Sequence, residues 1–329
     1  MTIGKASNFK VYQDEMRGGI VETLTQASNY FNGAGNAILL STVSRRGDFA
    51  KESFFKNIAN IVSRRDTTSV SAATDLLLSM DETISVKLNR KIGPVNQTYD
   101  AFAKVAMDMS PEEFSFLLGE MIGKGMQVEM LNSGLRAARA ALVQNTNLLH
   151  DAATDKLTTA HLVKGLAKFG DRASAISAWV MHSKNYFDLM EHQIGTSANG
   201  DIVSGTVVQS ATPATLNRPV IVTDSDALMV AGGSGSGAYT DYHVLGLTAG
   251  GVVVENSESE RVVLDEVTGL ENLVIRMQGE YAYNLGIKGY KYDTSAGANP
   301  TDATLGTSGS WDKAATSDKD LAGIIIQCR

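Results

Sequence analysis

The most extended helical pattern in the chain runs over residues 111–144. Ser110 is a good N-cap, Pro111 suits the first helical position, and Glu113 closes a capping box. Apolar side chains then recur at the spacing of one helix face: Phe114, Leu117, Leu118, Met121, Val128, Leu131, Leu135, Ala138 and Leu142. At ~1.5 Å per residue such a helix is ~50 Å long. We expect it to be the spine of an elongated subunit.

The patterns before the spine predict three helices and three strands. A one-sided apolar face predicts a helix over residues 13–32. Residues 37–44 and 49–55 are predicted to be strands, joined in a hairpin whose charged tip is Arg45-Arg46-Gly47-Asp48. A short helix over 57–62, a strand over 84–88 and a helix over 99–107 complete this part.

After the spine, helical and strand patterns are mixed. We predict a helix over 158–169 that ends at Gly170, a buried strand over 175–181, and a helix over 184–193 with Ser183 as its cap. Further strands are expected over 201–209, 218–223, 242–248 and 321–327, with a flexible loop over 232–237. Residues 270–292 are typical of an extended ribbon, with a bulge at Gln278-Gly279-Glu280. The predicted fold class is α+β.

Composition and charge exclude several classes of protein. The chain has 329 residues, of which 43% are apolar, and this suffices for more than one core. Its net charge of −7 is uneven, because residues 1–150 hold 16 basic and 15 acidic residues and residues 151–329 hold 13 and 21. We find no basic block typical of tight nucleic-acid binding, no secretory signal and no apolar run that could cross a bilayer.

The candidate catalytic and metal-binding motifs are weak. The glycine loop at 232–237 is followed by no lysine and no helix, so it does not fit a phosphate-binding loop. The five histidines stand in no metal-ligand spacing, and no nucleophile elbow occurs. The single cysteine, Cys328, excludes disulfides within the chain. We therefore predict no catalytic residue, cofactor or metal site, and interpret the extended pieces as parts whose apolar faces are completed by neighbouring subunits.

Four stretches carry a resemblance to a known family. They are Ile176-Ser-Ala-Trp-Val-Met-His-Ser-Lys, Arg218-Pro-Val-Ile-Val-Thr-Asp, Gly279-Glu-Tyr-Ala-Tyr-Asn-Leu-Gly-Ile-Lys-Gly-Tyr, and Asn299-Pro-Thr-Asp-Ala with Trp311-Asp-Lys and Lys319-Asp-Leu-Ala-Gly. Together with the order of the predicted elements, they resemble the tailed-phage major capsid protein with the HK97-type fold. The similarity spans nearly the whole chain.

The resemblance implies a domain plan. Residues 1–36 would form the N-arm and 37–95 the E-loop region. The P-domain would comprise 96–150, with the spine, and 256–292. The A-domain would comprise 151–255 and 293–329. The chain would assemble through pentamers and hexamers into an icosahedral head around double-stranded DNA, in the cytoplasm of the host bacterium.

The resemblance also bears on partners. Scaffolding would be a separate protein, since no long N-terminal scaffolding segment is present. A portal and a decoration protein are further expected partners, and contact with the packaged DNA would be weak and non-specific. No membrane is involved.

Two sets of residues are candidates for assembly. Arg45, Arg46 and Asp48 are expected to contact a neighbouring subunit. Gly123 and Gly125 stand inside the spine, where each glycine costs ~1 kcal/mol relative to alanine. They are either a hinge or sites of close packing. Two other functions stay open: a bacterial compartment shell of the encapsulin type, and an α+β enzyme with an unrecognised site.

Overall fold

The computed structural model describes residues 15–23, 35–56, 61–62, 64–65, 67–68, 70–71, 75–98, 111–152, 154–199, 215–232, 238–269 and 271–329. The predicted helix over 99–107 and strand over 201–209 lie outside these residues, as do positions 57–60 of the predicted short helix and most of the glycine loop. Residues 61 and 62 are bends rather than helix.

The spine is confirmed as α3 (Pro111–Gln144), a single helix of 34 residues. Its C-terminal half is buried, because Leu135, Ala138 and Leu142 are fully shielded from solvent. The single apolar stripe predicted for the whole helix is wrong in the N-terminal half, where Met126 and Met130 are buried instead. Leu117, Met121 and Val128 are 43%, 64% and 57% exposed. The apolar surface of this half therefore covers two faces, of which one has no cover within the described part of the subunit.

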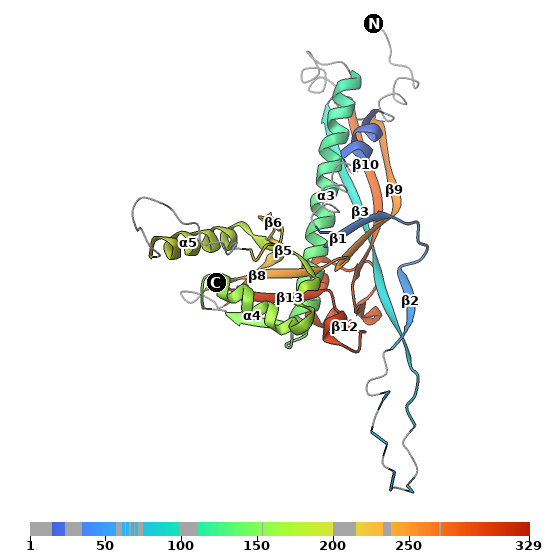
Figure 1. Ribbon diagram of the computed structural model, residues 1–329. Coiled ribbons are helices and arrows are strands. Elements are labelled where there is room, and N and C mark those ends of the chain that lie inside the picture. The colour runs from blue at the N-terminus through green and yellow to red at the C-terminus, as the bar shows by residue number, and fades with distance from the viewer. Residues whose placement is uncertain are drawn as a thin grey trace.

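A five-stranded sheet lies along α3 (Figure 1). Its strand order is β1 (Ile38–Thr42), β9 (Val252–Val267), β10 (Val274–Ile287), β3 (Met80–Thr98) and β2 (Phe49–Phe55). Strand β1 is parallel to β9, and the other pairs are antiparallel. The register of β10 with β3 shifts between Met277 and Gly279, which confirms the predicted bulge. Leu88, Val254, Tyr283 and Leu285 are buried in this part of the core.

The predicted hairpin of residues 37–44 with 49–55 is wrong. Strands β1 and β2 occupy opposite edges of the sheet, and residues 43–48 are the connection that crosses between them. Strand β2 instead pairs with β3, from Phe49 opposite Val86 to Phe55 opposite Met80. Alternating apolar residues predict a strand but do not identify its partner, so a short charged link between two strands was misread as a tight turn.

A six-stranded sheet forms the core of a second layer beside the spine. Its path is β4 (Leu149–Ala152), β13 (Gly323–Cys328), β8 (Tyr239–Thr248), β5 (Ile176–His182) and β6 (Val220–Thr223), and β7 (Met229–Gly232) also pairs with β8. Two helices pack on this sheet: α4 (Thr159–Phe169) contacts β4 and β13, and α5 (Ser183–Asn199) contacts β5 and β6. Gly170 ends α4 with a φ of 62°, as the sequence predicted. Trp179, Leu245 and Ile325 are fully buried.

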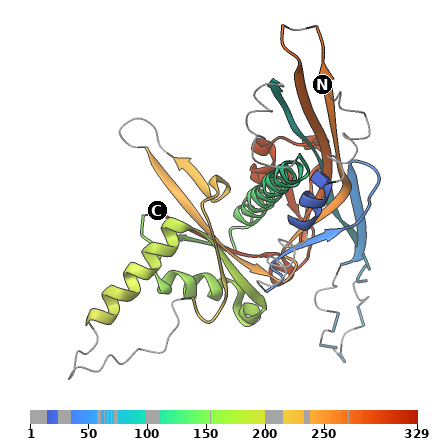
Figure 2. The same cartoon turned by 90° about the horizontal axis from the view of Figure 1, so that it is seen from above.

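Short elements connect the longer ones. They are η1 (Gly170–Ala175), η2 (Asp226–Leu228), β11 (Tyr290–Tyr292), η4 (Thr294–Ala296), α6 (Asp302–Leu305), η5 (Ser308–Ser310), β12 (Trp311–Lys313) and η6 (Asp318–Asp320). Among them, η2, α6, η5 and β12 contact α3. The indole of Trp311 is buried and donates to the carbonyl of Leu305 over 3.1 Å. Figure 2 shows the resulting two-part molecule, with the spine and its sheet on one side and the second sheet on the other.

Candidate functional site

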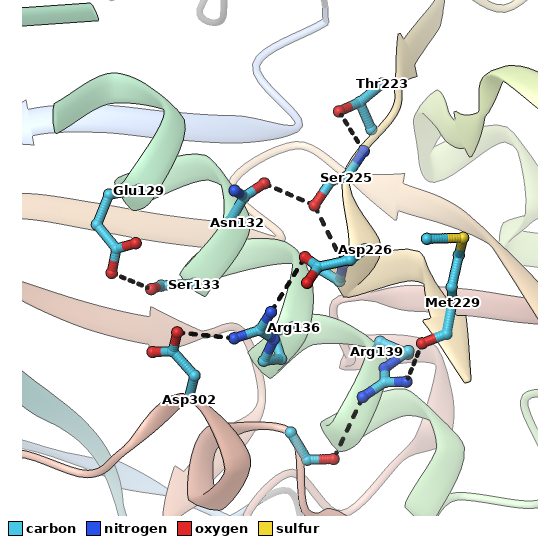
Figure 3. Close-up of polar contacts among 12 residues, drawn as sticks. Glu129, Asn132, Ser133, Arg136, Arg139, Thr223, Ser225, Asp226, Met229 and Asp302 are labelled. Carbon is cyan, nitrogen blue, oxygen red and sulfur yellow. Dashed lines mark hydrogen bonds and ion pairs between the residues drawn. The ribbon is translucent and has the colours of Figure 1, made fainter. Parts of the chain in front are cut away.

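The C-terminal half of α3 carries a polar network that joins the two parts of the molecule (Figure 3). Arg136 is its centre. One guanidinium nitrogen lies 3.1 Å from Asp226 Oδ1 on η2, and the other lies 2.9 Å from Asp302 Oδ2 on α6. The side chain of Arg136 is only 17% exposed. A planar guanidinium can hold two carboxylates in a fixed geometry, so Arg136 fixes both segments against the spine.

A second arginine brings the first sheet into the same network. Arg90, on β3, approaches Glu129 Oε1 to 2.7 Å and Asp302 Oδ1 to 2.9 Å. It also donates to Ser133 Oγ over 3.3 Å, and that hydroxyl donates to Glu129. Asp302 is thus shared by Arg90 and Arg136. We call Arg90, Glu129, Arg136, Asp226 and Asp302 the spine joint.

Hydrogen bonds to uncharged groups extend the spine joint along the helix (Figure 3). Arg139 donates to the carbonyls of Met229 and Gly306, and burial together with nearby Arg136 lowers the pKa of Arg139. Ser225 Oγ donates to Asn132 Oδ1 over 2.6 Å and accepts from the backbone N–H of Ala227, which caps η2. The contacts come from α3, β3, η2 and α6, and no short sequence motif identifies them.

The predicted contact residues lie in the β1–β2 connection. Arg45 bonds Glu255 on β9 over 2.5 Å and Glu52 on β2 over 2.7 Å, and these two carboxylates raise its pKa. Arg45 therefore holds the connection across the sheet within its own subunit. Arg46 and Asp48 are exposed. Of the three residues, Arg45 thus forms ion pairs within its own subunit, and Arg46 and Asp48 are charges on the surface.

The two predicted hinge glycines have different surroundings. A Cβ on Gly123 would meet Thr23 Cβ at 3.0 Å and the carbonyl of Ile20 at 3.3 Å, whereas a Cβ on Gly125 would meet nothing within 4 Å. Helix 15–23 thus packs closely on the spine at Gly123. Gly125 lines an open groove of about 1090 Å³ between α3 and the strands β3, β9 and β10.

Sequence reasoning missed two glycines that matter more for this packing. A Cβ on Gly119 would overlap the carbonyl oxygen of Met16, and one on Gly19 would overlap that of Phe116. The two backbones therefore cross at a distance that only glycine permits. The small-residue spacing of Gly119 and Gly123, four apart on one helix face, is the signal that could have found the crossing.

The β2–β3 hairpin projects from the first sheet (Figure 1). Its described residues expose many large apolar side chains: Phe55, Ile61, Val62, Val70, Leu76, Leu77, Leu78 and Met80, with exposures from 55% to 103%. Most exposed apolar residues of a monomer occur singly. A concentration of this kind in one projecting segment is typical of an interaction surface.

The described residues offer little for catalysis or metal binding. They contain no group of three His, Cys, Asp or Glu side chains that could hold a metal ion. Cys328 is buried, and burial raises the pKa of its thiol to about 12. Because the thiolate is the reactive form, this cysteine is not set up as a nucleophile. No helix in the described ranges is long and apolar enough to cross a membrane.

Comparison with known proteins gives one family. Residues 8–325 match the Gp13-like family, described as major capsid protein 13-like. No curated protein matches. Solved structures include Microbacterium phage Oxtober96, with 9% identity, 88% of this chain and 89% of that chain covered, and a TM-score of 0.51. The structure of Mycobacterium phage Bobi is 12% identical, with 93% of this chain and 89% of that chain covered and a TM-score of 0.49. The capsid of Helicobacter pylori bacteriophage KHP30 is 13% identical, with 92% of this chain and 91% of that chain covered and a TM-score of 0.47.

These findings confirm the α+β, HK97-like fold and the resemblance that the sequence indicated. They point to a structural role in the shell of a virion, where copies of the chain associate with one another. The family match covers nearly the whole chain, and the chain belongs to the Gp13-like family of phage major capsid proteins.

Proposed function

We propose that this capsid subunit assembles through pentamers and hexamers into an icosahedral head that encloses double-stranded DNA. The observation that carries the proposal is the family match over residues 8–325. The form of the subunit supports it, because an elongated spine with a projecting apolar hairpin leaves surfaces that only neighbours can cover. The role is structural, without catalysis.

The domain plan is part of this proposal. The N-arm comprises residues 1–36, the E-loop region 37–95, the P-domain 96–150 and 256–292, and the A-domain 151–255 and 293–329. The spine joint lies where the P-domain meets the A-domain segments that contain Asp226 and Asp302. Its ion pairs would make the two domains move as one body during assembly.

The β2–β3 hairpin is the proposed arm to a neighbouring subunit. A two-stranded ribbon is marginally stable in water by itself. Its exposed leucines, Leu76, Leu77 and Leu78, are therefore suited to an apolar surface of another subunit. Burying one such side chain is worth ~1.5–3 kcal/mol, and the contact would be repeated at every position of the shell.

Arg46 and Asp48 are proposed as a smaller contact with a neighbour. Both are exposed on the connection that Arg45 holds in place. An exposed ion pair is worth at most ~1 kcal/mol. Such a pair would select the orientation of the neighbour more than it would strengthen the shell.

Gly125 is the better hinge candidate of the two spine glycines. Close packing against Thr23 is a sufficient reason for Gly123. Gly125 has free space around it and faces the groove, so its lack of a side chain has no packing cause among the described residues. A bend at this point would let the N-terminal half of α3 move relative to the spine joint.

The remaining partners follow from the resemblance. We propose a separate scaffolding protein, a portal and a decoration protein, together with weak and non-specific contact with the packaged DNA. Assembly would take place in the cytoplasm of the host bacterium, and the finished subunit resides in the virion. The acidic net charge of −7 favours weak contact with DNA, because few phosphates would be neutralised.

Electron microscopy of the purified chain, expressed alone and with the scaffolding protein of the same phage, tests the proposal. We expect capsomers or closed icosahedral shells. A chain that stays monomeric at all concentrations under both conditions would contradict it. Closed shells that retain an enzyme bearing a docking peptide, rather than packaging DNA, would instead support the encapsulin-type compartment.

A further inference from the structure

Two histidines meet at the edge of the six-stranded sheet. His150 lies on the edge strand β4 and His161 on helix α4, with ring centroids 5.6 Å apart and the rings tilted by 47°. His161 is only 7% exposed. His150 Nε2 and His161 Nδ1 are buried and have no hydrogen-bond partner among the described residues. The pair thus joins α4 to β4 through ring contact and lacks polar contacts at these two nitrogens.

The groups around the pair disfavour added positive charge. The charges of Lys164 and Lys168 on α4 lower the pKa of His150. The charges of Lys164 and of His192 on α5 lower the pKa of His161. Two carboxylates and one backbone group oppose them. Asp151 lies on β4, Asp155 Oδ2 lies 3.9 Å from His161 Nε2 with a side chain 67% exposed, and the backbone of Lys156 also favours the protonated form of His161. Burial is the largest effect at both rings, and it lowers the pKa of both histidines together with the lysines.

Strand β13 also lies beside the pair, and its residue at this point, Ile326, is apolar. His150 stands opposite Ile326 in the parallel ladder, and α4 lies so close to β13 that a Cβ on Gly165 would come within 2.7 Å of the Ile326 side chain. A proton added to either ring would therefore find no acceptor on this side. A neutral imidazole has one N–H donor and one acceptor nitrogen, whereas an imidazolium has an N–H at both nitrogens. A buried N–H without an acceptor is destabilising, and the exposed Asp155 carboxylate offsets the added charge on His161 only in part.

We propose that His150 and His161 form an acid-sensitive latch, which packs α4 on β4 while both rings are neutral and releases this edge of the sheet when either is protonated. The folded-state pKa lies below the ordinary value of 6.5, so the stabilising contribution is complete above that value and is lost as the pH falls through the lowered pKa. Because β4 begins at Leu149, shortly after α3 ends at Gln144, release would loosen the attachment of the spine to the second sheet.

Hydrogen exchange of the full-length chain at pH 7.5 and pH 5.0, corrected for the intrinsic pH dependence of exchange, tests the latch. We expect peptides from β4 and α4 to lose protection about tenfold at pH 5.0 while peptides from β5 keep theirs. The double variant His150→Gln with His161→Gln should show no such additional loss. His192→Gln, at an exposed histidine on α5 whose charge has the smallest of these effects on His161, is the matched control and should keep the acid-induced loss that the double variant abolishes.

A direct titration keeps the test decisive if the double variant is already open at pH 7.5. Nuclear magnetic resonance of the histidine rings in the unmodified chain, assigned with the single variants, should show His150 and His161 both titrating below 6.5, and each single variant should raise the pKa of the other histidine of the pair. Ring pKa values of His150 and His161 at or above 6.5 in the folded chain would overturn the latch. So would equal acid-induced opening in the unmodified chain and the double variant.

Discussion

The carbonyl oxygen of Met16 occupies the place where a side chain on Gly119 would stand, so helix 15–23 rests directly on the backbone of the spine. We expect Gly119→Ala to push this helix away and expose part of Met16 and Ile20, which are now buried. Overpacking typically costs ~1–3 kcal/mol. The unfolding free energy, measured by urea denaturation, should fall by about that amount.

Gly125→Ala is the control for Gly119→Ala and also tests the hinge. A Cβ there meets nothing within 4 Å, so the variant should gain up to ~1 kcal/mol in unfolding free energy from helix propensity. If Gly125 is a hinge, the same variant should assemble or mature more slowly than the unmodified chain. Normal assembly kinetics with raised stability would remove the hinge and leave the packing role of Gly119 untouched.

Arg136→Ala should weaken the spine joint. It leaves Asp226 and Asp302 without their shared guanidinium, although Asp302 keeps its ion pair with Arg90, and the two carboxylate side chains are 71% and 49% exposed. Solvent would compensate in part, so we expect a loss of about 1–2 kcal/mol in thermal or urea unfolding. Lys124→Ala, which removes an exposed pair with Glu120, should cost less than ~0.5 kcal/mol. Equal effects of the two variants would contradict a special role for the spine joint.

Replacing the three exposed leucines of the β2–β3 hairpin should separate folding from assembly. Leu76→Ser, Leu77→Ser and Leu78→Ser together remove side chains that are 55%, 84% and 65% exposed, so the unfolding free energy should change little. The yield of closed shells should drop at least tenfold, as counted by electron microscopy. Val163→Ser, at a 50% exposed position on α4, is the control. Normal shell yield from the triple variant would show that these three leucines make no important contact.

Charge exchange tests the β1–β2 connection. Arg46→Glu with Asp48→Lys keeps the net charge and spares Arg45, whose bonds to Glu52 and Glu255 stabilise the subunit itself. We expect normal unfolding and a lower shell yield that recovers at high salt, because salt screens exposed charges. Arg45→Glu should instead lower subunit stability, since it would bring three carboxylates together. A normal yield at low salt would exclude a contact by Arg46 and Asp48.

His243 gives a separate pH dependence in the middle of the second sheet. Burial, followed by Arg139, lowers its pKa to about 4. The neutral form is favoured in the fold, so its contribution is complete above an ordinary value of 6.5 and is lost as the pH falls toward 4, by on the order of 3 kcal/mol. His243→Gln should flatten the fall of unfolding free energy between pH 6.5 and 4. An unchanged slope would show that other groups cause the acid sensitivity.

Local patterns in the sequence were reliable where local chemistry decides the structure. The capping signals of Ser110 and Pro111 and the long apolar period predicted the bounds of α3, and Gly170 predicted the end of α4. Strand β9 was missed, because its centre, Glu255 to Arg261, is polar. Those charges are matched by distant residues, such as Lys87 for Glu258 and Arg17 for Glu260. Only the folded sheet brings these partners together.

Sequence patterns could not identify the spine joint for the same reason. Arg90, Arg136, Asp226 and Asp302 are far apart in sequence and belong to no motif, so their convergence follows from topology alone. The assignment of the capsid family nevertheless succeeded, because it rested on the order of several stretches along the chain rather than on a site.

The strand order of the first sheet has a consequence for synthesis on the ribosome. Arg45 and its partner Glu255 are separated by 210 residues, and among the described strands β1 pairs with β9 alone. At roughly 5–20 residues per second, β1 waits about 10–40 s after its own translation before its partner strand exists. Strands β2 and β3 and the exposed apolar residues described between them emerge during this interval, before β9 and β10 exist to anchor them. Nascent chains of neighbouring ribosomes could then meet through this segment, so binding of a chaperone at the hairpin would protect the yield of subunits before any shell forms.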